Sequence, residues 1–177
     1  MFKKKNQKGF TLLELLVVIG IIGLLASIIV VNLTGARKRA RDVKRIADIR
    51  QMQTAAEDYY GKYGKYPTII SDMVTGGQIP IWPMDPLAPS GTTCAANSNS
   101  CYFYAYYTPS GTIGPQSYHI GASLEDTSSM LLNQDRDCNS TSGSGCPYSS
   151  AYTNNFTGAD TADCGGTAGR ACYDIAQ

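Results

Sequence analysis

The feature that most constrains this chain is an apolar run near its start, "KGFTLLELLVVIGIIGLLASIIVV", from Lys8 to Val31. Residues 15–31 contain no charged side chain, and with residues 10–14 the run reaches the roughly 20 residues that span a bilayer as a helix. Glu14 interrupts this run. Because an ionised carboxylate in a membrane helix costs about 2.5 to 3.5 kcal/mol, Glu14 predicts a specific charged partner.

The helical pattern continues beyond the apolar run. Residues 36–63 contain no proline, and apolar side chains recur there at steps of three and four residues, which is typical of an amphipathic helix. These side chains are Ile46, Ile49, Ala56, Tyr60 and Tyr63. The pattern predicts one helix from about Phe10 to Tyr60, with glycines 20, 23 and 35 as its weak points and stop signals in "GKYGKYPT".

The remainder of the chain predicts a small sheet with long loops. A proline-rich connector over residues 69–100 contains Trp82 as its expected packed anchor. Residues 102–107 and 117–124 predict an antiparallel hairpin, and residues 171–175 a third strand. Residues 127–169 lack periodicity, and they predict loops pinned by disulfides rather than core.

The fold class expected from these elements is α+β, with a long N-terminal helix packed on a small antiparallel sheet. We expect four segments along the chain. These are a basic leader over residues 1–9, an apolar transmembrane helix over 10–35, its amphipathic continuation over 36–61, and a globular head over 62–177.

Six cysteines lie after the apolar run and none before it. An even number on one side of a membrane span favours disulfides in an oxidising compartment. A zinc site is the weaker alternative, because there is no CxxC pair and only one histidine. Although other pairings stay open, short separations favour Cys94 with Cys101, Cys138 with Cys146, and Cys164 with Cys172.

Charge is segregated along the chain. From Pro67 onward there are nine acidic residues and two basic ones, a net of 2 − 9 = −7, which argues against a nucleic-acid-binding head. Seven basic residues lie within residues 37–50. This basic run is either a solvated helix face or a surface that pairs with acidic heads of neighbouring subunits or with lipid headgroups.

Oxygen-bearing side chains alternate in "DRDCN", where Asp135, Asp137 and Asn139 have a spacing suited to calcium. The segment lacks the glycine and glutamate of an EF-hand loop, and a solvated acidic loop is the competing interpretation. Asp160, Asp163 and Asp174 form a second acidic group along the sequence. His119 lies on a predicted strand without a nearby serine or free thiol, so we expect a packed or surface histidine and no enzyme.

The N-terminal segment resembles that of type IV pilins and of type II secretion pseudopilins. The resemblance lies in the basic leader ending at Gly9, in Phe10 and Thr11, and in Glu14 five positions into the mature chain. The segment "ARKRARDVKRIADIRQMQTAAEDYYGKYGKYPT" resembles the helix and connector of the major pseudopilin, and "MDP" at residues 84–86 its loop element. Major pseudopilins also bind calcium in the region of the second acidic group.

The resemblance implies how the chain is processed. A prepilin peptidase would cut between Gly9 and Phe10 and methylate the new amino group of Phe10. In a filament, the Glu14 carboxylate would pair with the Phe10 amine of a neighbouring subunit. The competing interpretation is that Glu14 only favours the helix N-terminus through the helix dipole, worth about 0.3 to 1 kcal/mol.

The expected function is that of a structural subunit in a type IV pilus-like filament. Its expected partners are other copies of the chain, the prepilin peptidase, membrane lipid before assembly, and an inner-membrane assembly platform with its ATPase. The precursor is expected in the cytoplasmic membrane and the filament at the cell surface. A major pseudopilin of a type II secretion system is the alternative, and a single-span membrane-anchored binding protein is a second.

Overall fold

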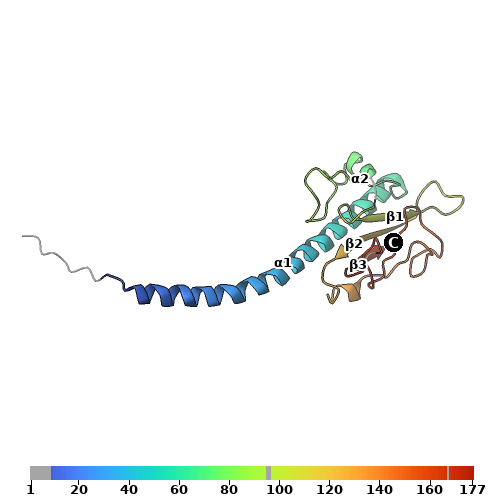
Figure 1. Ribbon diagram of the computed structural model, residues 1–177. Helices are drawn as coiled ribbons and strands as arrows, with labels where there is room; N and C mark the ends of the chain where they lie inside the picture. Colours follow the sequence, from blue (N-terminus) through green and yellow to red (C-terminus); the bar gives the residue numbers. More distant parts are fainter. Residues whose placement is uncertain (1–8, 95–96, 167) are drawn as a thin grey trace, which may run out of the picture. The chain divides into compact units, whose positions relative to one another are not determined.

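The computed structural model describes residues 9–94, 97–166 and 168–177, with residues 28–32 described in their backbone only. The chain divides into two compact units, Met1–Arg37 and Lys38–Gln177. In chain order the elements are α1 (Leu12–Tyr63), α2 (Ser71–Thr75), β1 (Phe103–Tyr107), β2 (Ser117–Leu124), the 3₁₀ turn η1 (Leu132–Gln134) and β3 (Ala171–Ala176) (Figure 1).

Helix α1 runs without a break through the three glycines that were expected to weaken it. It ends where Gly64 adopts a φ of 68° and donates its backbone N–H to the carbonyl of Tyr60 at 2.7 Å. This left-handed conformation costs little only for glycine, which explains why the helix stops there. The predicted end at Tyr60 was slightly early, because Gly61 lies inside the helix.

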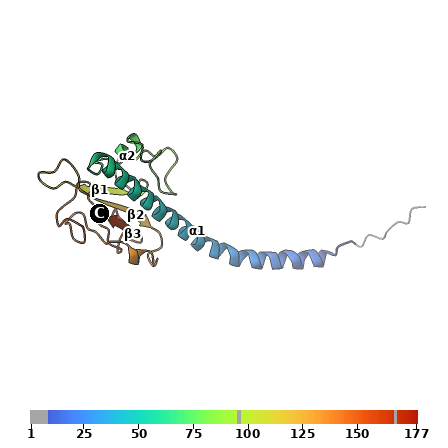
Figure 2. The same cartoon turned by 180° about the vertical axis from the view of Figure 1, so that it is seen from behind.

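The second unit is built on a three-stranded antiparallel sheet with the order β1-β2-β3. Phe103 on β1 is opposite Gly121 on β2, and His119 on β2 is opposite Ala176 on β3. The predicted hairpin and the predicted third strand are therefore confirmed. All eight residues of β2 are buried, because this central strand is covered on both faces (Figure 2).

One face of the sheet packs against the C-terminal part of α1. Ile49, Met52 and Ala56 of the helix form a single core with the sheet residues Tyr118 and Ile120, and all five are fully buried. Trp82 joins this core from the connector, and its Nε1–H donates to the carbonyl of Cys101 at 3.1 Å. The prediction that Trp82 anchors a packed loop is confirmed.

The opposite face of the sheet is covered by the long polar segment. Tyr152 and Phe156 of this segment pack on Phe103 and Ala105 of β1, together with Cys164. The prediction that residues 127–169 contribute loops rather than core was therefore wrong in its second half. Isolated aromatic side chains supply a second core from loops that show no periodic apolar pattern.

Tyrosine hydroxyls form the seam between α1 and its surroundings. Tyr102 donates to Asp48 of the helix at 2.6 Å, and Tyr118 donates to Glu57 at 2.8 Å. Tyr173 accepts a hydrogen bond from Arg50 at 2.8 Å. Each pair satisfies polar groups whose burial without a partner would cost about 1 to 3 kcal/mol.

Candidate functional site

The N-terminal processing segment is described from Gly9 onward, and the rest of the predicted leader lies outside the described residues. Gly9 and Phe10 precede α1 and are exposed, with Phe10 showing 87% of its surface. A Cβ built on Gly9 would meet no atom within 4 Å. The described residues therefore impose no requirement for glycine at residue 9, and cleavage after Gly9 stays a prediction.

Glu14 has a partner within its own chain. Its Oε2 accepts hydrogen bonds from the backbone N–H of Thr11 at 3.0 Å and from the Thr11 hydroxyl at 2.9 Å. The N–H of Glu14 in turn donates to Thr11 Oγ1 at 3.2 Å. This reciprocal pair is a capping box, and the spacing of threonine and glutamate in "TLLE" was the available sequence signal that our reasoning missed.

The first part of α1, on both sides of Glu14, exposes apolar side chains around its circumference. The exposed side chains are Leu12, Leu13, Leu15, Leu16, Val17, Val18, Ile19, Ile21, Ile22, Leu24 and Leu25. A helix that is apolar all round normally lies in apolar surroundings. This segment therefore needs a covering that the described residues of the chain do not provide.

None of the helices in the described residues combines the length and apolar character that crossing a membrane requires. The span predicted over residues 10–35 includes residues 28–32, whose side chains lie outside the description, and it stays a prediction.

The basic run has a defined structural role in its second half. Arg45 is fully buried and forms ion pairs with Asp42 at 2.6 Å, Asp85 at 2.5 Å and Glu125 at 2.8 Å. Arg41 binds both oxygens of Glu125, at 2.7 and 2.6 Å. These arginines bind acidic groups of their own chain, an alternative that the sequence analysis did not consider.

The six cysteines form three disulfides, Cys94 with Cys101, Cys138 with Cys146, and Cys164 with Cys172. These are the pairs favoured by short sequence separation. Because every cysteine is bonded to another cysteine, none is available as a thiolate ligand for zinc.

Three carboxylates converge beside the second core. Oxygens of Asp135, Asp137 and Asp160 lie within 4.8 Å of one another. The fold thus brings one residue of the second acidic group to the two predicted ligands in "DRDCN". The third predicted ligand, Asn139, instead uses its amide oxygen to accept a hydrogen bond from the N–H of Thr141 at 3.0 Å.

Asp135 is the most informative member of this cluster. Both of its carboxylate oxygens are buried, and neither accepts a hydrogen bond of normal geometry, while one oxygen of Asp160 is in the same condition. Burial raises the pKa of Asp135 to about 8, the charges of Asp174, Asp160 and Asp137 add to the rise, and the backbone N–H of Asp174 opposes it. A cation would supply the missing electrostatic partner, so the cluster fits a hard divalent ion such as calcium.

His119 is part of the second core. Its Nε2 lies 2.8 Å from Asp174 Oδ2, and its ring stacks on Phe156 with centroids 3.8 Å apart. Burial lowers the pKa of His119, and the Asp174 carboxylate opposes this. The expectation of a packed histidine is confirmed.

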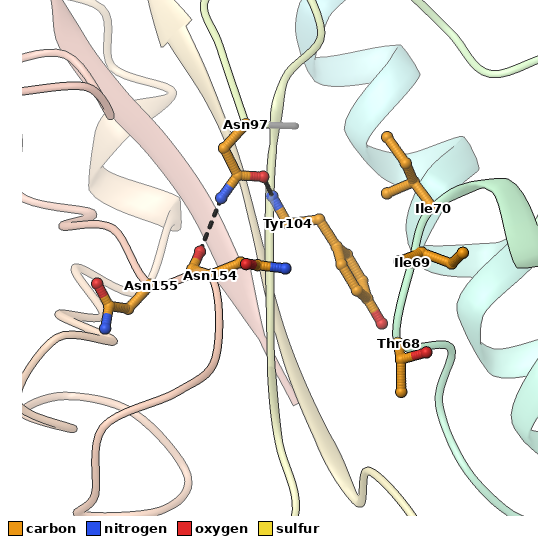
Figure 3. A pocket seen from close by; sticks show the side chains of 7 residues that line it. All are labelled: Thr68, Ile69, Ile70, Asn97, Tyr104, Asn154 and Asn155. Atoms are coloured by element: carbon orange, nitrogen blue, oxygen red, sulfur yellow. Dashed lines mark hydrogen bonds between the residues drawn. The ribbon is translucent and has the colours of Figure 1, made fainter. Parts of the chain in front are cut away.

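A separate cavity of about 390 Å³ lies between the connector and the loop around residue 154 (Figure 3). Asn97 closes one side by donating to the carbonyl of Asn154 at 2.7 Å and accepting from the N–H of Tyr104 at 2.8 Å. The Tyr104 hydroxyl is bound to the carbonyl of Pro67 at 2.8 Å. Most of the polar groups of the lining residues in Figure 3 therefore form hydrogen bonds within the protein. No charged side chain is among the described residues that line the cavity.

The N-terminal segment is similar in sequence to segments of known proteins. The prokaryotic N-terminal methylation motif matches residues 4–30. The chain therefore carries the amino-terminal segment of the type IV pilin and pseudopilin family. This pilin-type segment includes Gly9, Phe10, Thr11 and Glu14.

Relatives of both kinds share sequence with the chain. The type II secretion system core protein G of Aeromonas hydrophila is 44% identical over 66 residues, which cover 37% of this chain and 46% of that protein. The corresponding protein of Escherichia coli is 46% identical over 63 residues, covering 36% and 43%. The type IV wide pilus major component PilA4 of Thermus thermophilus is 60% identical over 38 residues, covering 22% and 29%.

These matches span less than half the length of the relatives named above. No solved structure matches the chain. The pilin-type segment is thus shared with known proteins, and these three matches each cover at most 37% of this chain.

Proposed function

We propose that this chain is a structural subunit of a type IV pilus-like filament. The observation that carries the proposal is the apolar part of α1, which lies within the matched methylation motif and exposes apolar side chains on all sides. Packing of many such helices side by side would cover these side chains. In this role the subunits are the principal partners, and the chain performs no catalysis of its own.

Processing would precede assembly. A prepilin peptidase would cut the peptide bond between Gly9 and Phe10, and the precursor would reside in the cytoplasmic membrane until an assembly platform and its ATPase extract it. The new Phe10 amine would then be the partner of Glu14 in a neighbouring subunit. The capping box supports this arrangement, because it holds the Glu14 carboxylate within one helical turn of the mature N-terminus.

A major pseudopilin of a type II secretion system is the second candidate. The longer matches to core protein G, 66 residues against 38 for the wide pilus component, favour it. A membrane-anchored binding protein is the third. Pilins and pseudopilins are both processed and polymerised, so mass spectrometry of the mature N-terminus applies to both.

Mass spectrometry of the intact chain tests the proposal. Material from sheared surface fibres should begin with methylated Phe10, and electron microscopy should identify the chain as the main fibre component. Assembled material that retains residues 1–9 would contradict the filament proposal. Processed chain confined to envelope pseudopili, in cells that lose protein secretion without it, would favour the secretion alternative.

We further propose that Asp135, Asp137 and Asp160 hold a calcium ion in the head. The buried oxygens of Asp135 support the proposal, because they lack protein donors. Calcium binding would add oxygen coordination and cross-link two loops that carry little regular structure. Calorimetric titration of calcium into the full-length chain, compared with Asp135→Asn, tests this site.

A further inference from the structure

The acidic cluster is backed by a fourth carboxylate that faces away from solvent. Asp174 on β3 is fully buried. Its Oδ1 accepts the backbone N–H of Asp137 at 2.9 Å, and its Oδ2 accepts that of Cys138 at 3.0 Å. Asp174 therefore fixes the backbone from which the Asp137 side chain projects, and its carbonyl accepts the N–H of Arg136, the residue after Asp135, at 3.3 Å.

The same residue limits the position of the loop that carries Asp160. Gly158 approaches Asp174 so closely that a Cβ on the glycine would lie 2.5 Å from the Asp174 carboxyl carbon. The Gly158 N–H also donates to the carbonyl of Cys138 at 2.8 Å. Glycine at residue 158 thus allows the two ligand-bearing loops to meet against one carboxylate.

His119 fixes the orientation of this carboxylate from the neighbouring strand. Its Nε2 lies 2.8 Å from Asp174 Oδ2, and stacking on Phe156 holds the imidazole plane. Phe156 belongs to the same loop as Gly158. This loop therefore contacts Asp174 directly through Gly158 and indirectly through Phe156 and His119.

We infer that Asp174 is a positioning residue for the cation site, with Gly158 and His119 as its supports. It gathers Asp135, Asp137 and Asp160 around the ion, while its own oxygens are engaged by backbone N–H donors and by His119. This inference rests on the proposed calcium site. Residues that orient metal ligands typically change affinity about 10 to 100-fold when they are replaced.

Calcium titration of the full-length chain after removal of metal with EDTA provides the test. Asp174→Asn keeps the side-chain shape but replaces one acceptor, and it should weaken calcium binding about 10 to 100-fold. Asp135→Asn should abolish binding. The matched control is Asp58→Asn, which removes the same charge from an exposed position on α1 and should leave affinity unchanged.

A second variant separates position from charge. Gly158→Ala retains every charged group but displaces the loop from Asp174, so it should also weaken calcium binding. Europium bound at the site gives an independent readout, because its luminescence lifetimes in H₂O and D₂O report the number of water ligands. Both Asp174→Asn and Gly158→Ala should admit additional water, whereas Asp58→Asn should not.

The outcomes distinguish the inference from the calcium proposal. Wild-type affinity and hydration in both Asp174→Asn and Gly158→Ala, with binding lost in Asp135→Asn, would overturn the positioning role alone. Absence of calcium binding in the wild-type chain would overturn the site itself. If near-ultraviolet circular dichroism shows that Asp174→Asn is misfolded, Gly158→Ala decides the question.

Discussion

Arg45 donates to both oxygens of Asp85, from Nε at 2.5 Å and from Nη2 at 3.0 Å, in an environment where neither side chain is exposed beyond a few per cent. The pair joins α1 to the proline-rich connector, and Asp42 and Glu125 complete the set of acidic partners. Asp85 belongs to the "MDP" segment, so the resemblance noted there coincides with a structural role.

Replacement of Arg45 should therefore be strongly destabilising. Arg45→Ala leaves Asp42 and Asp85 buried without their cation, a situation that costs about 3 to 5 kcal/mol. Urea unfolding of the full-length chain measures the loss. Arg39→Ala is the matched control, because the Arg39 side chain is 78% exposed in its pair with Asp126 and should contribute less than about 1 kcal/mol.

The ion pairs of Glu125 should make stability depend on acidity. The hydrogen bond from Arg41 lowers the pKa of Glu125 to about 2, and Arg45 adds to this effect while burial opposes it. The folded-state pKa lies below the ordinary value of 4.5, so the stabilisation is complete above pH 4.5 and disappears as pH falls through about 2.

Thermal unfolding from pH 6 to pH 2 tests this dependence. The melting-temperature difference between the wild-type chain and Glu125→Gln should shrink across the window from pH 4.5 to about pH 2. A difference that stays constant over this range would show that Glu125 does not contribute through its charge.

Glu14 should govern assembly through its charge, and Thr11 permits the necessary control. Both Glu14→Val and Thr11→Ala break the capping box, which costs about 0.5 to 2 kcal/mol of helix stability. Only Glu14→Val removes the charge that would neutralise a neighbour's Phe10 amine. We expect cleaved subunits without fibres from Glu14→Val, and fibres from Thr11→Ala, in electron micrographs and sheared fractions.

Equal loss of fibres in both variants would assign the effect to capping. Normal fibre yield from Glu14→Val would refute the intersubunit pair, and the helix-dipole interpretation would then account for the glutamate.

The disulfides should be recovered as three local bonds in non-reducing peptide maps of the mature chain. Loss of the bond between Cys138 and Cys146 by double replacement with alanine should cost about 2 to 3 kcal/mol in the chain-entropy model. Unfolding of that variant under EDTA measures the loss. Free thiols at any of the six positions in folded material would contradict the local pairing.

Regular patterns made the helix and sheet predictable. The apolar steps after residue 36 and the aromatic run around Tyr104 are local signals, so the helix and hairpin followed from short windows of sequence. The second core was missed for the opposite reason. Tyr152 and Phe156 are single aromatic residues in a polar segment, and only the sheet's second face gives them a common packing surface.

The candidate sites likewise differ in how far the sequence could predict them. Gly9, Phe10 and Glu14 lie close together in the sequence, whereas Asp160 joins Asp135 only because Gly158 packs on Asp174 and donates to the carbonyl of Cys138. The partners of Arg45 lie as far as 80 residues away along the chain. Such pairings depend on topology, which is why a run of basic residues could not be resolved into buried and solvated members beforehand.

The tyrosine seam along α1 has a mechanical consequence. Asp48 meets Tyr102 and Glu57 meets Tyr118, so each hydroxyl is matched to one site on the helix. Sliding the helix by a single turn would separate these pairs at once and leave the buried Tyr102 and Tyr118 hydroxyls without these acceptors. Under a pulling force along the helix, this interface should resist sliding until its hydrogen bonds break together.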